Sequence, residues 1–476
     1  MTKVVVIGMG YVGIPAAALF ADVDGFNVVG IQRRSKRSGW KIDALNRGEC
    51  PIGGDEPGLA ELLQRTIVEK KTFRVTDDMN ECKDADFILI DVQTPTDADG
   101  IPRYESLKEV SRNMAPLLSS GQTVIIESTC APGTTNHIVR PILEEGSGLV
   151  AGEDFHLVFS YERVMVGRLI HNIVNYPRIV GGINQTSTEK GLWLYKHIVR
   201  QPIYPTDAMT SEVAKTVENA YRDVNIAFAN EVALICESLC IDVNEVRSFV
   251  NTLPFDPSNP ITNPHRNMHM PGSGVGGHCL PKDSWLLKYG VDTYGKFKVD
   301  PKVIIGSRLL NDSMPAHTIG LLREALSMAG KQAEGSKIAV FGVAFLENSD
   351  DPRNTPTARF VEELRKNGAE AVLHDPLVKD HDYPEPMLRD IYEALEGADA
   401  MVIMTKHKEY VDMSLEKARS TMATPIIIDG RNTFDGRKAE EAGFLYLGVG
   451  KGQHLPFCKE NAADKYAPGG KCVNRD

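Results

Sequence analysis

The sequence has no long apolar run, few cysteines and no excess of basic residues, and each shortage excludes a class of protein. No stretch approaches the roughly 18 residues that a membrane-spanning helix needs, and the opening MTKVVVIGMG shows no charged leader followed by an apolar core. Eight cysteines occur in 476 residues, and the close pair Cys236 and Cys240 lacks the spacing of a zinc or redox motif. A formal net charge of −11 disfavours a nucleic-acid partner. We expect a cytoplasmic protein with no membrane or nucleic-acid partner, no bound metal and mostly buried thiols.

Short apolar runs of strand length occur in two series, and segments of helical spacing separate most of them. The runs lie at residues 3–8, 27–31, 87–92, 123–128 and 155–162, and again at 337–343, 371–376, 400–405 and 425–432. Strands that are apolar on both faces and alternate with helices are typical of a parallel sheet covered on both sides. We predict an α/β protein in which two Rossmann-like, doubly wound domains are joined by a central helical domain. The expected domain boundaries are 1–205, 206–315 and 316–476.

Between the two series, TSEVAKTVENAYRDVNIAFANEVALICESL has the spacing of one long helix. Such a helix is far longer than the usual ~11 residues, so it connects domains or builds a subunit interface. Polar residues recur on it at steps of three and four and share one face, namely Glu212, Lys215, Asn219, Arg222 and Asp223. This face is either solvated or turned toward partners or a ligand, and the pattern leaves both interpretations open.

The segment GMGYVG has the G-x-G-x-x-G spacing of a dinucleotide-binding turn, with Gly8, Gly10 and Gly13 as its glycines. It follows an apolar run and precedes the helix-like IPAAALFAD, which is the context that the motif needs. The glycines permit a tight turn and close approach of the backbone to a pyrophosphate, while the helix N-terminus supplies unpaired N–H groups. We therefore predict a bound dinucleotide, with Tyr11 and Val12 in the same turn.

The second apolar run ends in GIQRRSKR, where an acid that holds the ribose 2′-hydroxyl of NAD is expected. Gln32 stands at that position, and Arg33 and Arg34 follow it. A cluster of cations can accept the 2′-phosphate of NADP, whereas a carboxylate would repel it. NAD and NADP both remain open, because this segment can equally be a solvated basic turn beside a glutamine that bonds the ribose.

The segment PGSGVGGHCLPKD places Cys279 at the end of a glycine-rich loop, next to His278 and shortly before Lys282 and Asp283. A structural thiol is expected inside an apolar element, whereas cationic neighbours and helix N-termini favour the thiolate that acts as a nucleophile. The glycines would let a substrate reach the sulfur. We predict that Cys279 is catalytic, while His278 by itself could equally be a packing residue.

Together with VQTPT, ESTCAPGTT, SYERVMVG, EVAKTVENAYR, SDDPRNTP and DGRN, these segments resemble the nucleotide-sugar 6-dehydrogenases over nearly the whole chain. That family includes the UDP-glucose, UDP-N-acetylhexosamine and GDP-mannose dehydrogenases, and the loop PGSGVGGHC is most similar to the UDP-N-acetylglucosamine and UDP-N-acetylmannosamine branch. The resemblance implies NAD-dependent, four-electron oxidation of a sugar C6 alcohol to a carboxylate through a thiohemiacetal and a thioester on Cys279. It also implies an N-terminal NAD-binding domain, a C-terminal UDP-sugar-binding domain and a homodimer.

The resemblance further assigns roles to single residues. Lys215 and Asn219 would stabilise an oxyanion, Asp283 and Thr129 would position water, and Glu162 would be the general base of thioester hydrolysis. The expected cofactor-binding residues are Gly8, Gly10, Tyr11, Val12, Gly13, Gln32, Arg33, Thr94, Ser128, Thr129 and Arg353. The expected substrate-binding residues are Glu162, Arg163, Lys215, Asn219, Arg266, Gly272, Gly274, Gly276 and Arg431.

One departure concerns the last domain, where UDP-glucose enzymes carry a substrate-binding lysine after the first strand and this chain has Leu346. Arg266 could supply a phosphate or sugar contact instead, across a dimer. UDP-glucose is the alternative substrate. A two-electron hydroxyacid dehydrogenase would explain neither Cys279 nor the last domain, and a catalytically silent dinucleotide-binding protein would not need the complete set of polar residues.

Overall fold

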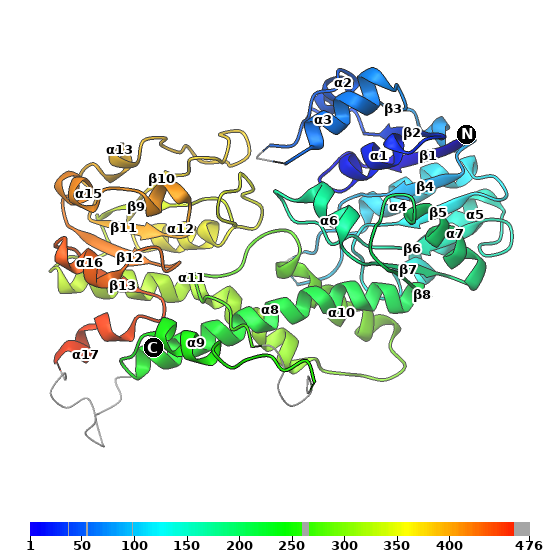
Figure 1. Cartoon of the computed structure of the whole chain (residues 1–476). Helices are drawn as coiled ribbons and strands as arrows, with labels where there is room; N and C mark the ends of the chain where they lie inside the picture. The colour runs from blue at the N-terminus through cyan, green and yellow to red at the C-terminus, as the bar shows by residue number, and fades with distance from the viewer. Residues whose placement is uncertain (37, 54–55, 98, 259–265, 461–476) are drawn as a thin grey trace. The chain divides into compact units, whose positions relative to one another are not determined.

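The computed structural model describes residues 1–36, 38–53, 56–97, 99–258 and 266–460. The chain divides into two compact units, of which the first is Met1–Ala220 with Lys282–Pro301 and the second is Tyr221–Pro281 with the residues from Lys302 onward. Each unit has its own sheet, labelled β1 to β8 and β9 to β13 in Figure 1. The predicted fold class, with two Rossmann-like domains and a helical central region, is confirmed. The three expected domain boundaries remain predictions.

The first unit is built on an eight-stranded sheet of order β3-β2-β1-β4-β5-β6-β7-β8. Neighbouring strands are parallel except for β6 and β7. Its strands are β1 Thr2–Ile7, β2 Phe26–Ile31, β3 Phe73–Thr76, β4 Phe87–Ile90, β5 Thr123–Ile126, β6 His156–Phe159, β7 Arg178–Gly182 and β8 Ile203–Asp207. Its helices are α1 Gly13–Asp22, α2 Trp40–Asn46, α3 Leu59–Leu63, α4 Glu105–Met114, α5 Arg140–Ser147, α6 Leu169–Asn175 and α7 Gln185–Tyr195.

Alternating residues of this sheet pack on opposite faces. Val4 and Val6 of β1 belong to one buried cluster with side chains of α1, α3, α6 and α7. Val5 and Ile7 belong to a second cluster with side chains of α4 and α5. Because both faces are covered, the strands read as continuous apolar runs, and this is why the sequence predicted them well.

The second unit has a parallel five-stranded sheet of order β10-β9-β11-β12-β13. Its strands are β9 Lys337–Phe341, β10 Glu370–His374, β11 Ala400–Ile403, β12 Ile426–Asp429 and β13 Leu445–Gly448. Its helices are α9 Val243–Val250, α11 Lys302–Met328, α12 Pro356–Lys366, α13 Ile391–Leu395, α14 Lys408–Val411, α15 Leu415–Thr421, α16 Gly436–Glu441 and α17 Pro456–Glu460.

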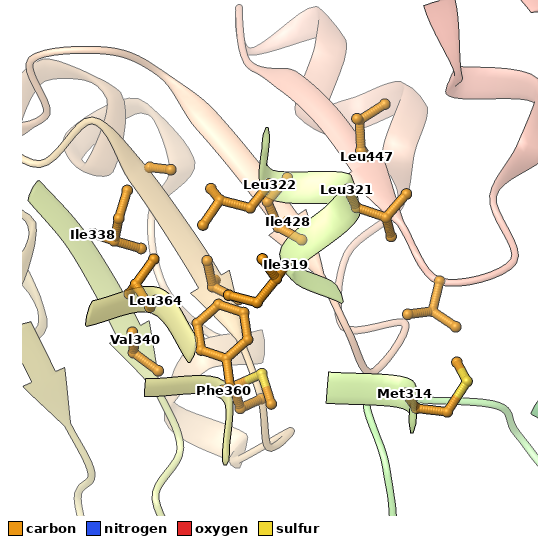
Figure 2. Close-up of a cluster of buried hydrophobic side chains, with 14 of the residues drawn as sticks. Met314, Ile319, Leu321, Leu322, Ile338, Val340, Phe360, Leu364, Ile428 and Leu447 are labelled. Atoms are coloured by element: carbon orange, nitrogen blue, oxygen red, sulfur yellow. The ribbon is translucent and has the colours of Figure 1, made fainter. Parts of the chain in front are cut away.

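The largest core of the second unit lies between this sheet and helices α11 and α12. Figure 2 shows Phe360 and Leu364 of α12 beside Val340 and Ile338 of β9, with Ile319 of α11 in the same cluster. Helix α12 starts sharply because the Thr355 hydroxyl accepts a hydrogen bond from the Thr357 N–H and Pro356 occupies the first turn. The cap therefore holds Phe360 against the sheet.

The predicted long helix is α8, Ala208–Ser238, which has 31 residues and contributes to both units. Its polar stripe is not a solvated face, because Glu212, Lys215 and Asp223 are buried, although Arg222 is exposed. Helix α10, Leu280–Tyr294, also belongs to both units, because its residues up to Pro281 lie in the second unit and those from Lys282 onward lie in the first. No helix of the described residues is long and apolar enough to cross a membrane.

Four strands lie outside the predicted series, namely β3, β7, β8 and β13. β7 has the sequence RIVGG, and glycine weakens a strand pattern. β8 contains Pro205, which is tolerated because β8 is an edge strand.

The structure also pairs Cys240 with Cys458 in a disulfide across 218 residues, although we expected mostly thiols. Cys82, Cys130 and Cys236 are buried thiols as predicted.

Candidate active site

The glycine turn after β1 fits a dinucleotide. Gly8 has φ +112°, and a Cβ there would overlap the carbonyl group of Asp91, while a Cβ at Gly13 would overlap the carbonyl oxygen of Gly8. These two glycines are therefore required by the protein itself. A Cβ at Gly10, in contrast, would meet no atom within 4 Å. An open position at the middle glycine, just before the N-terminus of α1, is what the approach of a pyrophosphate requires.

Glu162 and Lys215 form the first half of a polar cluster in the first unit. Glu162 follows β6, and its carboxylate accepts a hydrogen bond from the N–H of Val164. The Lys215 Nζ donates to the carbonyl oxygen of Glu162 at 2.8 Å and lies 3.8 Å from its carboxylate Oε1. The same ammonium lies 5.3 Å from the centre of the Tyr161 ring. The cation is thus held in place at the carboxyl end of the sheet.

Asn219, one helical turn after Lys215, belongs to the second half of the cluster. Its Nδ2 donates to Oδ2 of Asp283 at 2.5 Å, and the Lys282 Nζ donates to Oδ1 of the same carboxylate at 2.7 Å. The Asp283 side chain is fully buried in the first turn of α10. Asp283 therefore fixes the amide and one of the two lysines. An amide donor and a cation on neighbouring turns can stabilise a developing oxyanion.

The loop after β5 carries Ser128 and Thr129, and Glu212 anchors the residues that follow. The Ser128 hydroxyl donates to the carbonyl oxygen of Val92 at 2.7 Å, and the Thr94 hydroxyl donates to that of Thr129 at 2.5 Å. These bonds connect the two predicted cofactor loops at the strand ends.

Glu212 accepts hydrogen bonds from the Gly133 N–H at 2.6 Å and from the backbone and hydroxyl of Thr135, each at 2.7 Å. Burial raises the pKa of Glu212 to about 7.

A buried ionic network beneath these loops was not predicted. Arg178 of β7 pairs with Glu127 and also donates to the hydroxyl of Ser160 at 2.9 Å. Tyr195 donates to Glu127 at 2.6 Å, and its ring lies 3.7 Å from the Arg178 guanidinium carbon. Burial, and then the negative charge of Glu127, raises the pKa of Asp91. The signal for this network in the sequence was the presence of Asp91 and Glu127 near the ends of two apolar runs, at 87–92 and 123–128.

Arg163, a predicted substrate-binding residue, is held by neighbours within the first unit. Its guanidinium bonds the Glu218 carboxylate at 2.8 and 2.9 Å and the carbonyl oxygen of Pro177 at 2.8 Å. These bonds fix the position of the segment after β6, where Glu162 also lies. The substrate role of Arg163 stays a prediction.

The glycine-rich loop before Cys279 lies in the second unit and packs on the residues after β12. Gly274 has φ +111°, and a Cβ at Gly276 would press on Phe345. Arg431 donates to the carbonyl oxygens of Met404 at 2.7 Å and Gly274 at 2.9 Å. Burial lowers the pKa of Arg431 to about 10. Arg431 therefore shapes the loop, and its contact with substrate remains a prediction.

Arg353 contacts this loop near its C-terminal end, where Cys279 also lies. Arg353 is paired with Asp351 through two bonds from Nε at 2.8 and 2.9 Å, and its carbonyl oxygen accepts from the N–H of Gly277 at 3.0 Å. Cys279 is half-buried and immediately precedes α10, while His278 is exposed. A helix N-terminus stabilises a thiolate. Arg266 is half-buried, and Gly272 abuts Arg431.

The first unit contains Glu162, Lys215, Asn219 and Asp283. Cys279 belongs to the second unit and precedes Lys282 of the first unit by three residues in the chain. The described residues contain no group of three or more His, Cys, Asp or Glu side chains arranged to hold a metal ion.

Three sequence models of one family match the chain in succession. The NAD-binding domain of the UDP-glucose/GDP-mannose dehydrogenase family matches residues 2–199, its central domain residues 209–313 and its UDP-binding domain residues 339–436.

Individual relatives match over nearly the full length. The UDP-N-acetyl-D-mannosamine dehydrogenase of Pyrococcus horikoshii is 38% identical over 94% of this chain and 99% of its own. That of Campylobacter jejuni is 32% identical over 88% of this chain and 98% of its own. The crystal structure of an NDP-N-acetyl-D-galactosaminuronic acid dehydrogenase from Methanosarcina mazei is 41% identical, covers 95% of this chain and 96% of its own, and superposes with a TM-score of 0.83.

Proposed function

Because the chain belongs to the UDP-glucose/GDP-mannose dehydrogenase family, we propose that it oxidises the C6 alcohol of a UDP-N-acetylhexosamine to a carboxylate. That it is an NAD-dependent nucleotide-sugar dehydrogenase follows from the family itself. The choice of an N-acetylated sugar is supported by the names of the relatives, which are UDP-N-acetyl-D-mannosamine dehydrogenases and an NDP-N-acetyl-D-galactosaminuronic acid dehydrogenase. UDP-ManNAc, UDP-GlcNAc and UDP-GalNAc are the candidate substrates, and UDP-glucose is the alternative.

The observation that carries the proposal is the cluster of Lys215, Asn219 and Asp283 beside Glu162. NAD, held at the glycine turn around Gly10 and the N-terminus of α1, would supply the hydride acceptor, and oxidation of one alcohol to a carboxylate would use two NAD because it removes four electrons. In the proposed sequence, Lys215 and Asn219 donate hydrogen bonds to the oxygen on C6 while it carries negative charge. The 2.5 Å hydrogen bond from Asn219 to Asp283 supports a role for Asp283 in keeping this amide oriented.

Cys279 would act on the aldehyde left by the first oxidation. Its sulfur bonds to C6, and the carbonyl oxygen takes a proton, which gives a thiohemiacetal. Loss of the hydroxyl proton and of a second hydride, for which a second NAD would be the acceptor, would leave a thioester. Glu162 would then take a proton from water as the water attacks the thioester, and the sulfur leaves as the thiolate while the carboxylate product forms. Thr129 would help to position that water.

The test is a count of reduced cofactor per sugar consumed, with NAD and the three N-acetylated UDP-sugars, UDP-glucose and GDP-mannose. We expect two reduced cofactors per sugar with one N-acetylated substrate. A count of one would contradict the four-electron reaction, and turnover with UDP-glucose alone would contradict the choice of sugar.

A Cys279→Ser variant tests the sulfur directly, with Cys50→Ser as its matched control. Cys50 is also half-buried, but it lies in the first unit and donates to the carbonyl oxygen of Ile52. We expect Cys279→Ser to bind NAD and UDP-sugar yet lose four-electron turnover, and Cys50→Ser to retain it. Unchanged turnover of Cys279→Ser would refute the covalent sequence.

A homodimer completes the proposal. Large apolar side chains on one side of α8 are exposed in the single chain, with Tyr221 at 70%, Phe228 at 55% and Ile235 at 50%, and Leu239, directly after the helix, is 61% exposed. They recur at steps of seven and four, so they form one stripe along the helix. An exposed apolar stripe of this kind favours a helix of a second copy as its cover. Light scattering on wild type and Phe228→Glu tests this, since a monomeric wild type would contradict it.

A further inference from the structure

The end of β2 has no carboxylate where NAD-specific Rossmann domains hold the ribose 2′-hydroxyl. The residue at that position, Gln32, uses its side chain within the protein. Its Oε1 accepts the N–H of Met9 at 3.1 Å, and its Nε2 donates to the Ser38 hydroxyl at 3.1 Å. Gln32 thus braces the glycine turn without placing a negative charge beside the ribose. A 2′-phosphate, which a carboxylate would repel, meets no such repulsion from this side chain.

Cationic and hydroxyl groups surround the same position. The Arg33 side chain is 77% exposed, and its ion pair with the exposed Glu109 is long, at 3.8 Å. Such a pair contributes little, so the guanidinium can turn to a phosphate at small cost. The Ser35 and Ser38 hydroxyls lie 2.9 Å apart on the turn, and the Ser38 N–H donates to Ser35. Their O–H groups are donors of the kind that a phosphate accepts.

A second cation lies at the base of the glycine turn. The Lys41 Nζ, on the first turn of α2, donates to the carbonyl oxygen of Met9 at 3.2 Å. Met9 therefore connects Lys41 and Gln32 to the dinucleotide loop. Arg34 differs, because Asp77 at 3.2 Å and Asp43 at 3.9 Å already neutralise it. Arg33, whose ion pair with Glu109 is long, is thus more available to a phosphate than Arg34.

We propose that Arg33, Ser35, Ser38 and Lys41, with the neutral Gln32, form a subsite for the adenosine 2′-phosphate, so that the enzyme uses NADP as well as NAD. Arg33 donates two parallel N–H groups to the phosphate oxygens, and the serine hydroxyls complete the cradle. The subsite concerns the cofactor alone. It holds whichever UDP-sugar is the substrate, so its failure and a failure of the proposed function are distinguishable.

The direct test is binding of 2′,5′-ADP and 5′-AMP to the full-length protein without sugar, measured by isothermal titration calorimetry. The two probes differ only in the 2′-phosphate. We expect 2′,5′-ADP to bind at least about tenfold more tightly at low salt, because charge-assisted hydrogen bonds to a phosphate are among the stronger ones. We also expect this advantage to shrink as ionic strength rises. Equal or weaker binding of 2′,5′-ADP would overturn the proposal.

Single variants test which residues cause the expected preference for 2′,5′-ADP over 5′-AMP. Arg33→Gln is expected to remove most of the preference for 2′,5′-ADP while 5′-AMP still binds, which also shows that the variant is folded. Gln32→Glu keeps an acceptor for the Met9 N–H but adds a carboxylate, so it is expected to reverse the preference. Arg47→Gln is the control, because Arg47 is paired with Glu49 and its loss removes the same charge elsewhere in the domain. An unchanged preference in both Arg33→Gln and Gln32→Glu would refute the assignment.

Discussion

Replacing Glu212 with glutamine tests how the buried carboxylate on α8 supports the segment after β5 that contains Gly133 and Thr135. The side chain is fully buried and accepts hydrogen bonds from the backbone of Gly133 and from the backbone and hydroxyl of Thr135. Burial outweighs these bonds and raises the pKa from 4.5 to about 7. Glu212→Gln preserves the shape of the side chain and removes its ionisation. The difference between the two proteins therefore isolates one titration.

The sign and size of the effect follow from linkage. Between pH 4.5 and about 7, the folded chain keeps a proton on Glu212 that the unfolded chain has released. The free energy of unfolding of the wild type therefore falls as pH rises through this window, by about 3 kcal/mol in all. The glutamine variant does not take part in this loss. Its stability relative to wild type should thus improve by about 3 kcal/mol between pH 4.5 and pH 8.

The assay is thermal unfolding of both proteins across this pH range. For a unit of this size, about 3 kcal/mol corresponds to roughly 6–12 °C in the relative Tm. Other ionisable groups are common to both chains and cancel in the difference. If the relative Tm of Glu212→Gln instead falls as pH rises, the three hydrogen bonds outweigh burial and the reasoning is wrong.

Three further predictions address the glycine turn, the buried network and the core. Gly10→Ala should change the Tm by less than about 1 °C, because its Cβ meets no protein atom, yet it should weaken NAD binding in calorimetry. Gly13→Ala should lower the Tm, because its Cβ overlaps the carbonyl oxygen of Gly8, and equal Tm values for the two variants would contradict this reasoning. Arg178→Met should cost about 3–5 kcal/mol in denaturant unfolding, since Glu127 is left buried without its cation, and a cost under about 1 kcal/mol would argue against the network. Phe360→Ala should cost about 3–5 kcal/mol through the cavity it leaves, and retention of wild-type stability would show that the core collapses around it.

Much of the fold could be predicted because its signals are local. A strand buried on both faces, such as Val4 to Ile7, is apolar at every position, and the glycine turn that follows it needs specific residues at fixed spacing. Edge strands were harder to predict, since β8 is largely exposed and contains Pro205. For the candidate site, the motifs located Glu162, Lys215, Asn219 and Asp283 individually, yet the hydrogen bond between Asn219 and Asp283 joins residues 64 apart.

The sequence by itself determined the alternation of buried strands and helices, the dinucleotide turn and the long helix, because each depends on periodicity or on backbone freedom within a few residues. The tertiary structure alone decided which charges are buried together. Arg178 meets Glu127 51 residues away, Glu212 anchors Thr135, and Gln32 turns toward Met9. Such pairings depend on which strand ends meet at one edge of a sheet. Spacing along the chain does not encode that neighbourhood.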